Sequence, residues 1–111
     1  MADIIPPAVV HEMEIKGFET EVLQTPGSIH YLGNVFLPKG HRFYGKEHDE
    51  INLICILENG EDNLNYWLSD SYFMHEDYYW CIGFNTDNGD GTVPTLNDTI
   101  NSLISLVELL V

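Results

Sequence analysis

Polar and apolar residues alternate through much of the first third of the chain. The alternation begins in Glu12–Ile15, is interrupted by Gly17 as in a β-bulge, and continues through Phe18–Gln24. A second run of period two extends over residues 29–37, after a turn at residues 25–28 in which proline and glycine favour chain reversal. We therefore predict two antiparallel strands joined as a hairpin.

The middle of the chain contains two more concentrated apolar segments. Ile51–Leu57 is apolar on both faces, which is typical of a strand in the centre of a sheet, and Tyr78–Phe84 is predicted to form another strand. Residues 38–50 are rich in glycine, histidine and charge and are predicted to form a loop. A connection as long as residues 58–77 is expected to be partly structured or functional.

The last segment has the pattern of an amphipathic helix. Thr95 and Asp98 have the spacing of a capping box and follow Pro94. One helical face is then apolar and consists of Leu96, Ile100, Leu103, Val107 and Leu110. Since Ile104, Leu106 and Leu109 widen this face, the helix is expected to pack across the sheet, and its excess apolar surface could also bury a homodimer contact.

These elements predict an α+β fold, with an antiparallel sheet of about four strands and one C-terminal helix packed on it. Pro6 and Pro7 oppose helix formation, so residues 1–10 are expected to form an extended arm. Residues 11–111 are then a single α+β domain, consistent with a length of 111 residues.

The charge of the chain indicates what kind of partner it binds. The chain has 18 acidic and four basic residues and a formal net charge of −14. Thirteen of the acidic residues follow Lys46, after which no lysine or arginine occurs. Such a balance opposes direct binding to DNA or RNA, where cationic groups must replace counterions, and suits a protein partner with a basic surface. A surface that serves only solubility remains the alternative.

The N-terminus and the cysteines predict the cellular compartment of the protein. The first ten residues lack the basic region of a signal peptide, and no segment has the roughly 20 apolar residues that span a bilayer. We therefore expect a cytoplasmic protein with no membrane association. Cys55 and Cys81 lie within apolar runs and are expected to be buried free thiols.

Little in the chain predicts catalysis or a cofactor. No Gly-x-Ser-x-Gly sequence occurs, and buried thiols are poor nucleophiles. His41 and His48 share a loop with acidic residues, which permits a metal site without indicating one. Residues 85–91 only superficially resemble a calcium loop, because the glycine offset is wrong. The expectation is a protein that is not an enzyme and has no metal or cofactor.

Two segments are candidates for binding. The first combines carboxylates with aromatic residues, which suits a protein interface, and its expected contact residues are Glu58, Glu61, Asp62, Trp67, Asp70, Tyr72, Glu76 and Asp77. The second is the only basic patch, which could hold the phosphate of a small ligand or nucleotide and comprises Lys39, His41, Arg42, Tyr44 and Lys46. The basic loop could equally do no more than offset its acidic neighbours.

Two motifs resemble those of a family of small uncharacterised phage and prophage proteins. Residues 38–46 read PKGHRFYGK, and residues 80–84 read WCIGF, followed by Gly89 and Asp90. The chain departs from the family where relatives carry a His-Gly-Gly stretch and a histidine before the Gly-Asp pair. What it shares is His41, Tyr44, Gly45, Asp49 and Trp80.

The resemblance implies a phage accessory setting, in which small acidic proteins often block host defence. Together with the charge, it leads to the hypothesis of a non-enzymatic inhibitor of a host nucleic-acid-binding protein, such as a CRISPR or restriction nuclease. The inhibitor would act like a DNA mimic. The alternative is a small-ligand or nucleotide-binding module that uses the basic loop.

Overall fold

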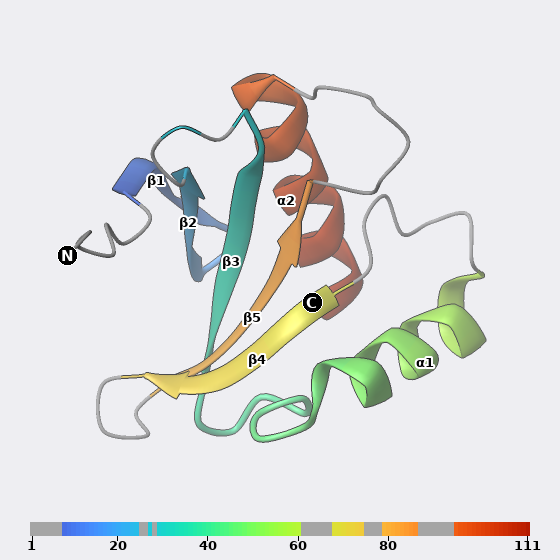
Figure 1. Cartoon of the computed structure of the whole chain (residues 1–111). Coiled ribbons are helices and arrows are strands. Elements are labelled where there is room, and N and C mark those ends of the chain that lie inside the picture. The colour runs from blue at the N-terminus through green and yellow to red at the C-terminus, as the bar shows by residue number, and fades with distance from the viewer. Residues whose placement is uncertain (1–7, 25–26, 28, 61–67, 75–78, 87–94) are drawn as a thin grey trace, which may run out of the picture.

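Five strands and two helices make up the part of the chain that the structure describes (Figure 1). The structure is a computed structural model, and it describes residues 8–24, 27, 29–60, 68–74, 79–86 and 95–111. In chain order the elements are β1 (Ala8–Ile15), β2 (Phe18–Gln24), β3 (Tyr31–Pro38), α1 (His48–Asn59), β4 (Leu68–Met74), β5 (Tyr79–Asn85) and α2 (Leu96–Leu110).

The strands form one antiparallel sheet in the order β1-β2-β3-β5-β4. This confirms the α+β class and the pairing of β2 with β3, and it adds a fifth strand. The bulge predicted at Gly17 is wrong. Lys16 (φ 49°) and Gly17 (φ 88°) instead form a two-residue turn between β1 and β2, because paired positive φ values match the twist of a tight hairpin.

The strand predicted at Ile51–Leu57 is also wrong, because this segment lies in α1. A continuous apolar run is ambiguous between a buried strand and a helix. Here Ile51 and Cys55 are buried one helical turn apart, whereas Leu53 and Leu57 are 56% and 76% exposed. The loop predicted for residues 38–50 therefore ends where α1 begins, at His48.

Strand β4 lies within the long connection of residues 58–77, which is therefore partly structured as expected. It occupies the edge of the sheet beside β5 and packs against α1. Asn52 of α1 joins the two elements. Its side-chain amide donates to the Leu68 carbonyl oxygen (2.9 Å) and accepts from the Leu68 N–H (3.0 Å).

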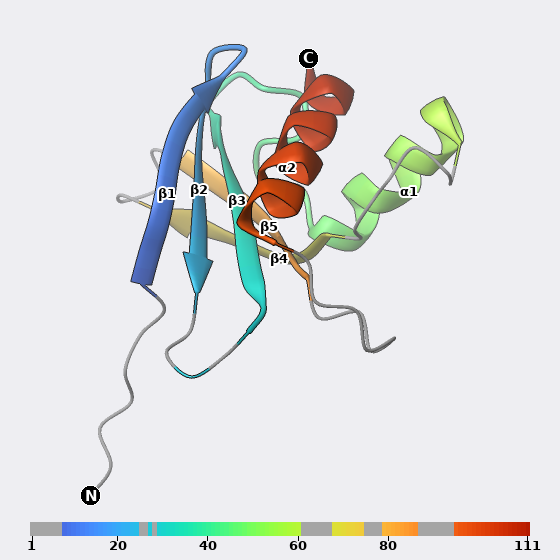
Figure 2. The ribbon, with the colours of Figure 1, turned by 90° about the horizontal axis from the view of Figure 1, so that it is seen from above.

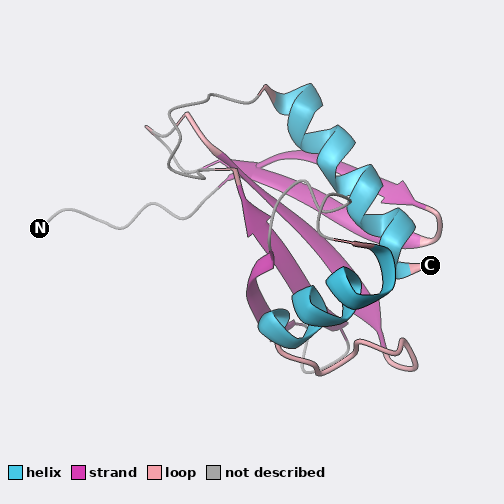
Figure 3. Ribbon diagram, turned by 90° about the vertical axis from the view of Figure 1, so that its right-hand side faces the viewer, coloured by secondary structure: helices cyan, strands magenta, loops and turns pink. Residues whose placement is uncertain are grey.

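Helix α2 has the predicted capping box, since the Thr95 hydroxyl accepts from the Asp98 N–H and the Asp98 carboxylate accepts from the Thr95 N–H. The helix crosses β3 and β2, and both helices lie on the same face of the sheet (Figure 3). Leu103, Leu106 and Val107 are buried against the sheet. The apolar face of α2 is thus largely used within the chain, and the homodimer stays a prediction.

The extended arm predicted at the N-terminus overlaps β1. Residues 8–10 of the predicted arm are the start of β1, and residues 1–7 lie outside the described residues. Cys55 and Cys81 are buried free thiols, as expected. Neither α1 nor α2, the helices of the described residues, has the length and hydropathy to cross a membrane.

Candidate functional site

One face of the sheet is covered by α1 and α2, and no described helix packs on the other (Figures 2 and 3). Side chains alternate between the two faces along each strand, so the strand registers assign residues to the side that has no described helix. We call this side the outer face. Its polar and aromatic part comprises Glu12, Glu14, Glu19, Glu21, Asn34, Phe36, Asp70, Tyr72, Tyr79, Cys81 and Gly83. The same registers place Val9, Leu23, Leu32, Pro38 and Asn85 on this face.

A first row of residues crosses the outer face through all five strands. Directly paired positions run from β1 to β4 as Glu12, Glu21, Asn34, Gly83 and Asp70. The Asn34 amide donates to the Glu21 carboxylate (3.2 Å), and Asn34 lies where a side chain on Gly83 would be. The row therefore has carboxylates at both ends and a glycine that makes room for the amide between them.

A second row runs parallel to the first. Its paired positions are Glu14, Glu19, Phe36, Cys81 and Tyr72. Four glutamates are thus contributed by one hairpin, two from β1 and two from β2. Together with Phe36 they line a concavity of about 690 Å³ on the outer face.

The aromatic half of the outer face is closely packed. Tyr72 is 39% exposed and shares a side-chain hydrogen bond with the thiol of Cys81, which is fully buried. Burial raises the pKa of Cys81 to about 12 and also raises the pKa of Tyr72. The negative charges of Glu21 and Asp70 raise both pKa values further. The thiol is therefore protonated at neutral pH and is a poor nucleophile.

The glutamates of the hairpin face one another in like-charged pairs. Glu12 is directly opposite Glu21, and Glu14 is directly opposite Glu19. Like charges at opposed positions destabilise a sheet. The arrangement is therefore unfavourable for the fold by itself, as is typical of surfaces on which binding competes with stability.

We expect Glu19→Gln to raise the free energy of unfolding by about 0.5 kcal/mol, because it relieves the repulsion from Glu14. The gain should shrink when salt screens the wild-type pair. Urea unfolding at low and high NaCl measures both effects. Glu108→Gln is the control, since it removes one negative charge from an exposed residue 3.9 Å from Lys16 and should give no gain. Equal changes in the two variants would contradict this account.

The residues predicted for partner binding fall in three places. Asp70 and Tyr72 lie on the outer face. Glu58 lies on α1 and is paired with Arg42. The remaining five lie outside the described residues: Glu61, Asp62, Trp67, Glu76 and Asp77. Sequence reasoning missed the four hairpin glutamates, although two acidic i, i+2 pairs on either side of Lys16-Gly17 are a signal for opposed carboxylates.

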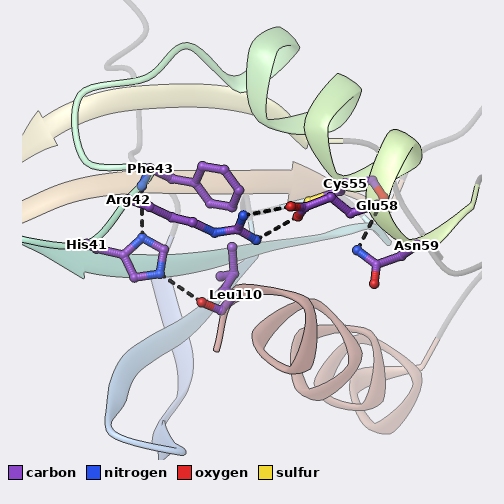
Figure 4. Close-up of polar contacts among 7 residues, drawn as sticks. All are labelled: His41, Arg42, Phe43, Cys55, Glu58, Asn59 and Leu110. Carbon is purple, nitrogen blue, oxygen red and sulfur yellow. Dashed lines mark hydrogen bonds and ion pairs between the residues drawn. The ribbon is translucent and has the colours of Figure 1, made fainter.

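The basic loop is tied to its surroundings by its own side chains (Figure 4). The Arg42 guanidinium donates to both oxygens of Glu58 (3.0 and 2.9 Å), and these hydrogen bonds hold the pKa of Glu58 below its ordinary value. Lys46 pairs with Glu50 (3.2 Å), and the Tyr44 ring packs on that of Phe73 (centroids 5.7 Å apart). Lys39 is exposed. The alternative hypothesis, a ligand site in the basic loop, therefore has less support than a partner-binding site on the outer face.

His41 joins the basic loop to the end of α2 (Figure 4). The Phe43 N–H donates to His41 Nδ1 (3.1 Å), so the neutral ring carries its proton on Nε2, which lies 2.9 Å from the Leu110 carbonyl oxygen. That carbonyl lies in the last turn of α2, where the carbonyl oxygens have no hydrogen-bond partner within the helix. The ring of His41 also packs between Phe18 and Phe43.

We expect His41→Ala to lower the free energy of unfolding by about 2 kcal/mol, because two backbone groups lose their partner and the aromatic packing is opened. Chemical denaturation measures the loss. Lys39→Ala, in the same loop, should change stability by less than about 0.5 kcal/mol. A His41→Ala variant as stable as Lys39→Ala would return His41 to the set of ligand candidates.

A serine and a histidine meet at the start of α1. Ser71 Oγ accepts from the His48 N–H (3.2 Å), lies 3.0 Å from His48 Nδ1 and donates to Glu47 (3.3 Å). Because the first N–H groups of a helix lack internal partners, these contacts cap α1 from β4. Among the described residues, no three His, Cys, Asp or Glu side chains are placed to hold a metal ion.

The fold and the site define an α+β domain with an acidic and partly aromatic sheet face on which no described helix packs. Comparison of the chain with protein-family models, curated proteins and solved structures finds no match. The function is therefore argued from the geometry of the outer face.

Proposed function

We propose that the protein is a non-enzymatic inhibitor that docks its outer face on the basic, nucleic-acid-binding surface of another protein. The observation that carries the proposal is the set of four hairpin glutamates around one concavity, with Asp70 at the far end of the first row. Neighbouring strands lie about 5 Å apart, and alternate residues along a strand about 7 Å apart. A rigid array of carboxylates on this scale offers anionic groups where a nucleic acid would offer phosphates.

The electrostatics favour a basic partner over any other. The net charge of −14 repels acidic proteins and nucleic acids, and attracts a surface rich in arginine and lysine. Such attraction accelerates association and weakens with ionic strength. When the protein occupies that surface, the partner cannot bind its own nucleic acid. Inhibition of this kind requires no chemical reaction on either molecule. With the resemblance to phage proteins, a host defence nuclease of the CRISPR or restriction type is the partner class we propose, in the host cytoplasm.

The experiment compares three proteins as baits in bacterial lysate at low salt. They are the wild type, the outer-face variant Glu14→Gln/Glu19→Gln, and the control Asp49→Asn/Glu108→Gln. Both variants remove two negative charges, but Asp49 and Glu108 are exposed and lie on the helices. Support requires a nucleic-acid-binding protein that the wild type and the control retain and the outer-face variant loses.

A functional readout must accompany capture. Added in excess, the wild-type protein should abolish binding of the captured partner to its nucleic acid in a mobility-shift assay. We expect the outer-face variant to be weaker by about tenfold to a hundredfold, because each lost charge contact is worth about 1 kcal/mol or more. Unchanged nucleic-acid binding by the partner, or equal potency of both variants, would refute the proposal.

A further inference from the structure

Aromatic side chains form the middle of the outer face, beside the carboxylates. Phe36 and Tyr72 both pair with Cys81 in register, one from each neighbouring strand. The rings of Phe36 and Tyr79 have centroids 6.2 Å apart. Tyr72 is 39% exposed, so its ring is accessible at the surface. We call Phe36, Tyr72 and Tyr79 the aromatic patch.

Carboxylates border the aromatic patch on two sides. Glu19 is directly opposite Phe36 on β2. On the other side, Asp70 is two residues from Tyr72 along β4, and it acts on the ionisation of that tyrosine. A cation that approached the rings would therefore meet an anionic group at either border of the patch.

Arginine and lysine differ in how they would use such a surface. The guanidinium is planar and weakly hydrated, stacks on aromatic rings, and offers a fork of donors to a carboxylate. The lysine ammonium is a compact and strongly hydrated charge that gains less from a ring. We infer that the outer face selects a partner segment that presents arginine side chains, with guanidinium groups on the aromatic patch and their donors toward Glu19 and Asp70. This inference rests on the proposed function and specifies its partner.

The chain contains an internal example of the same arrangement. The Arg42 guanidinium lies over the Phe43 ring, 4.3 Å from its centroid, while it donates to both oxygens of Glu58. An aromatic ring and a carboxylate thus hold an arginine at a half-exposed position of this protein. The outer face offers the same two components without an arginine among the described residues of its strands.

The test uses two peptides of equal length and charge, one with six arginines and one with six lysines, titrated into the full-length protein by calorimetry at low salt. We expect the arginine peptide to bind about threefold to tenfold more tightly, as ring contacts of about 0.5–1 kcal/mol each imply. In Phe36→Leu/Tyr72→Leu, which removes two of the three rings, this preference should fall below about twofold, with affinity for the lysine peptide unchanged. Tyr72→Phe keeps the ring and should keep the preference.

The outcomes separate the inference from the proposed function. Equal affinity of the two peptides for the wild type, or an arginine preference that survives in Phe36→Leu/Tyr72→Leu, overturns the inference and leaves acidic docking standing. Failure of both peptides to bind, or full binding by Glu14→Gln/Glu19→Gln, removes docking on the outer face itself. Thermal melting of each variant confirms that the affinities refer to folded protein.

Discussion

Gly33→Ala is expected to lower the free energy of unfolding by about 2–3 kcal/mol, although alanine is ordinarily the better residue in a strand. Gly33 is buried in β3 and pairs with Phe84 of β5. The Phe84 ring, only 3% exposed, lies where the added methyl group would be. Since the ring belongs to the core beneath α2, it cannot move aside without displacing its neighbours. Urea unfolding measures the loss.

A double-mutant cycle isolates the contact behind this expectation. Phe84→Leu removes the ring and costs stability by itself, but adding Gly33→Ala to it should cost little. The coupling between the two positions should therefore reach about 1 kcal/mol or more, in the sense that the double variant is more stable than the sum predicts. Additive losses would mean that the Gly33 backbone, rather than the Phe84 ring, sets the requirement for glycine.

The sequence predicted those elements in which local chemistry and hydrophobic period agree. The sequence of helix α2 predicts a capping box and one apolar face, and the structure has both. The pairing of β2 with β3 followed from alternation on either side of a Pro-Gly turn. In both cases the information lies within one short segment.

Two elements, α1 and β4, could not be predicted because their stability comes from distant contacts. Segment Ile51–Leu57 has the apolar pattern of a buried strand. It is helical in the structure, where α1 packs against β4 and Ser71 of that strand caps the helix. Strand β4 itself has Ser69 and Asp70 near its start and acquires its place from Asn52, 16 residues earlier. Tertiary packing thus overrides local propensity in both elements.

The binding segment predicted from the sequence, residues 58–77, stays a prediction, and the outer face takes most of its carboxylates from elsewhere. Four of its five carboxylates come from the β1–β2 hairpin, and only Asp70 comes from residues 58–77. The difference has one cause, which is that Lys16-Gly17 is a turn and not a bulge. A turn at that point sets Glu12 and Glu14 opposite Glu21 and Glu19, whereas a bulge would have left them far apart on one long strand.

Asn52→Ala is expected to lower the free energy of unfolding by about 3 kcal/mol. Asn52 is 6% exposed and satisfies both backbone polar groups of Leu68, which is itself buried. Removing the amide leaves a buried N–H and a buried carbonyl without partners, at about 1–3 kcal/mol for each. Asn101→Ala is the matched control, because Asn101 is exposed on α2 and the same substitution there should change little. Equal losses in the two variants would contradict the role of the amide.

The same substitution should weaken partner binding through β4. Leu68 begins the strand that places Asp70 and Tyr72 on the outer face, and Asn52 is its anchor to α1. In Asn52→Ala, amide hydrogen exchange should therefore accelerate in β4 and α1 before it does in β2 and β3. Binding to the arginine peptide should fall while the hairpin glutamates stay in place. If instead exchange accelerates equally throughout the sheet, Asn52 supports the whole domain and not the edge that completes the site.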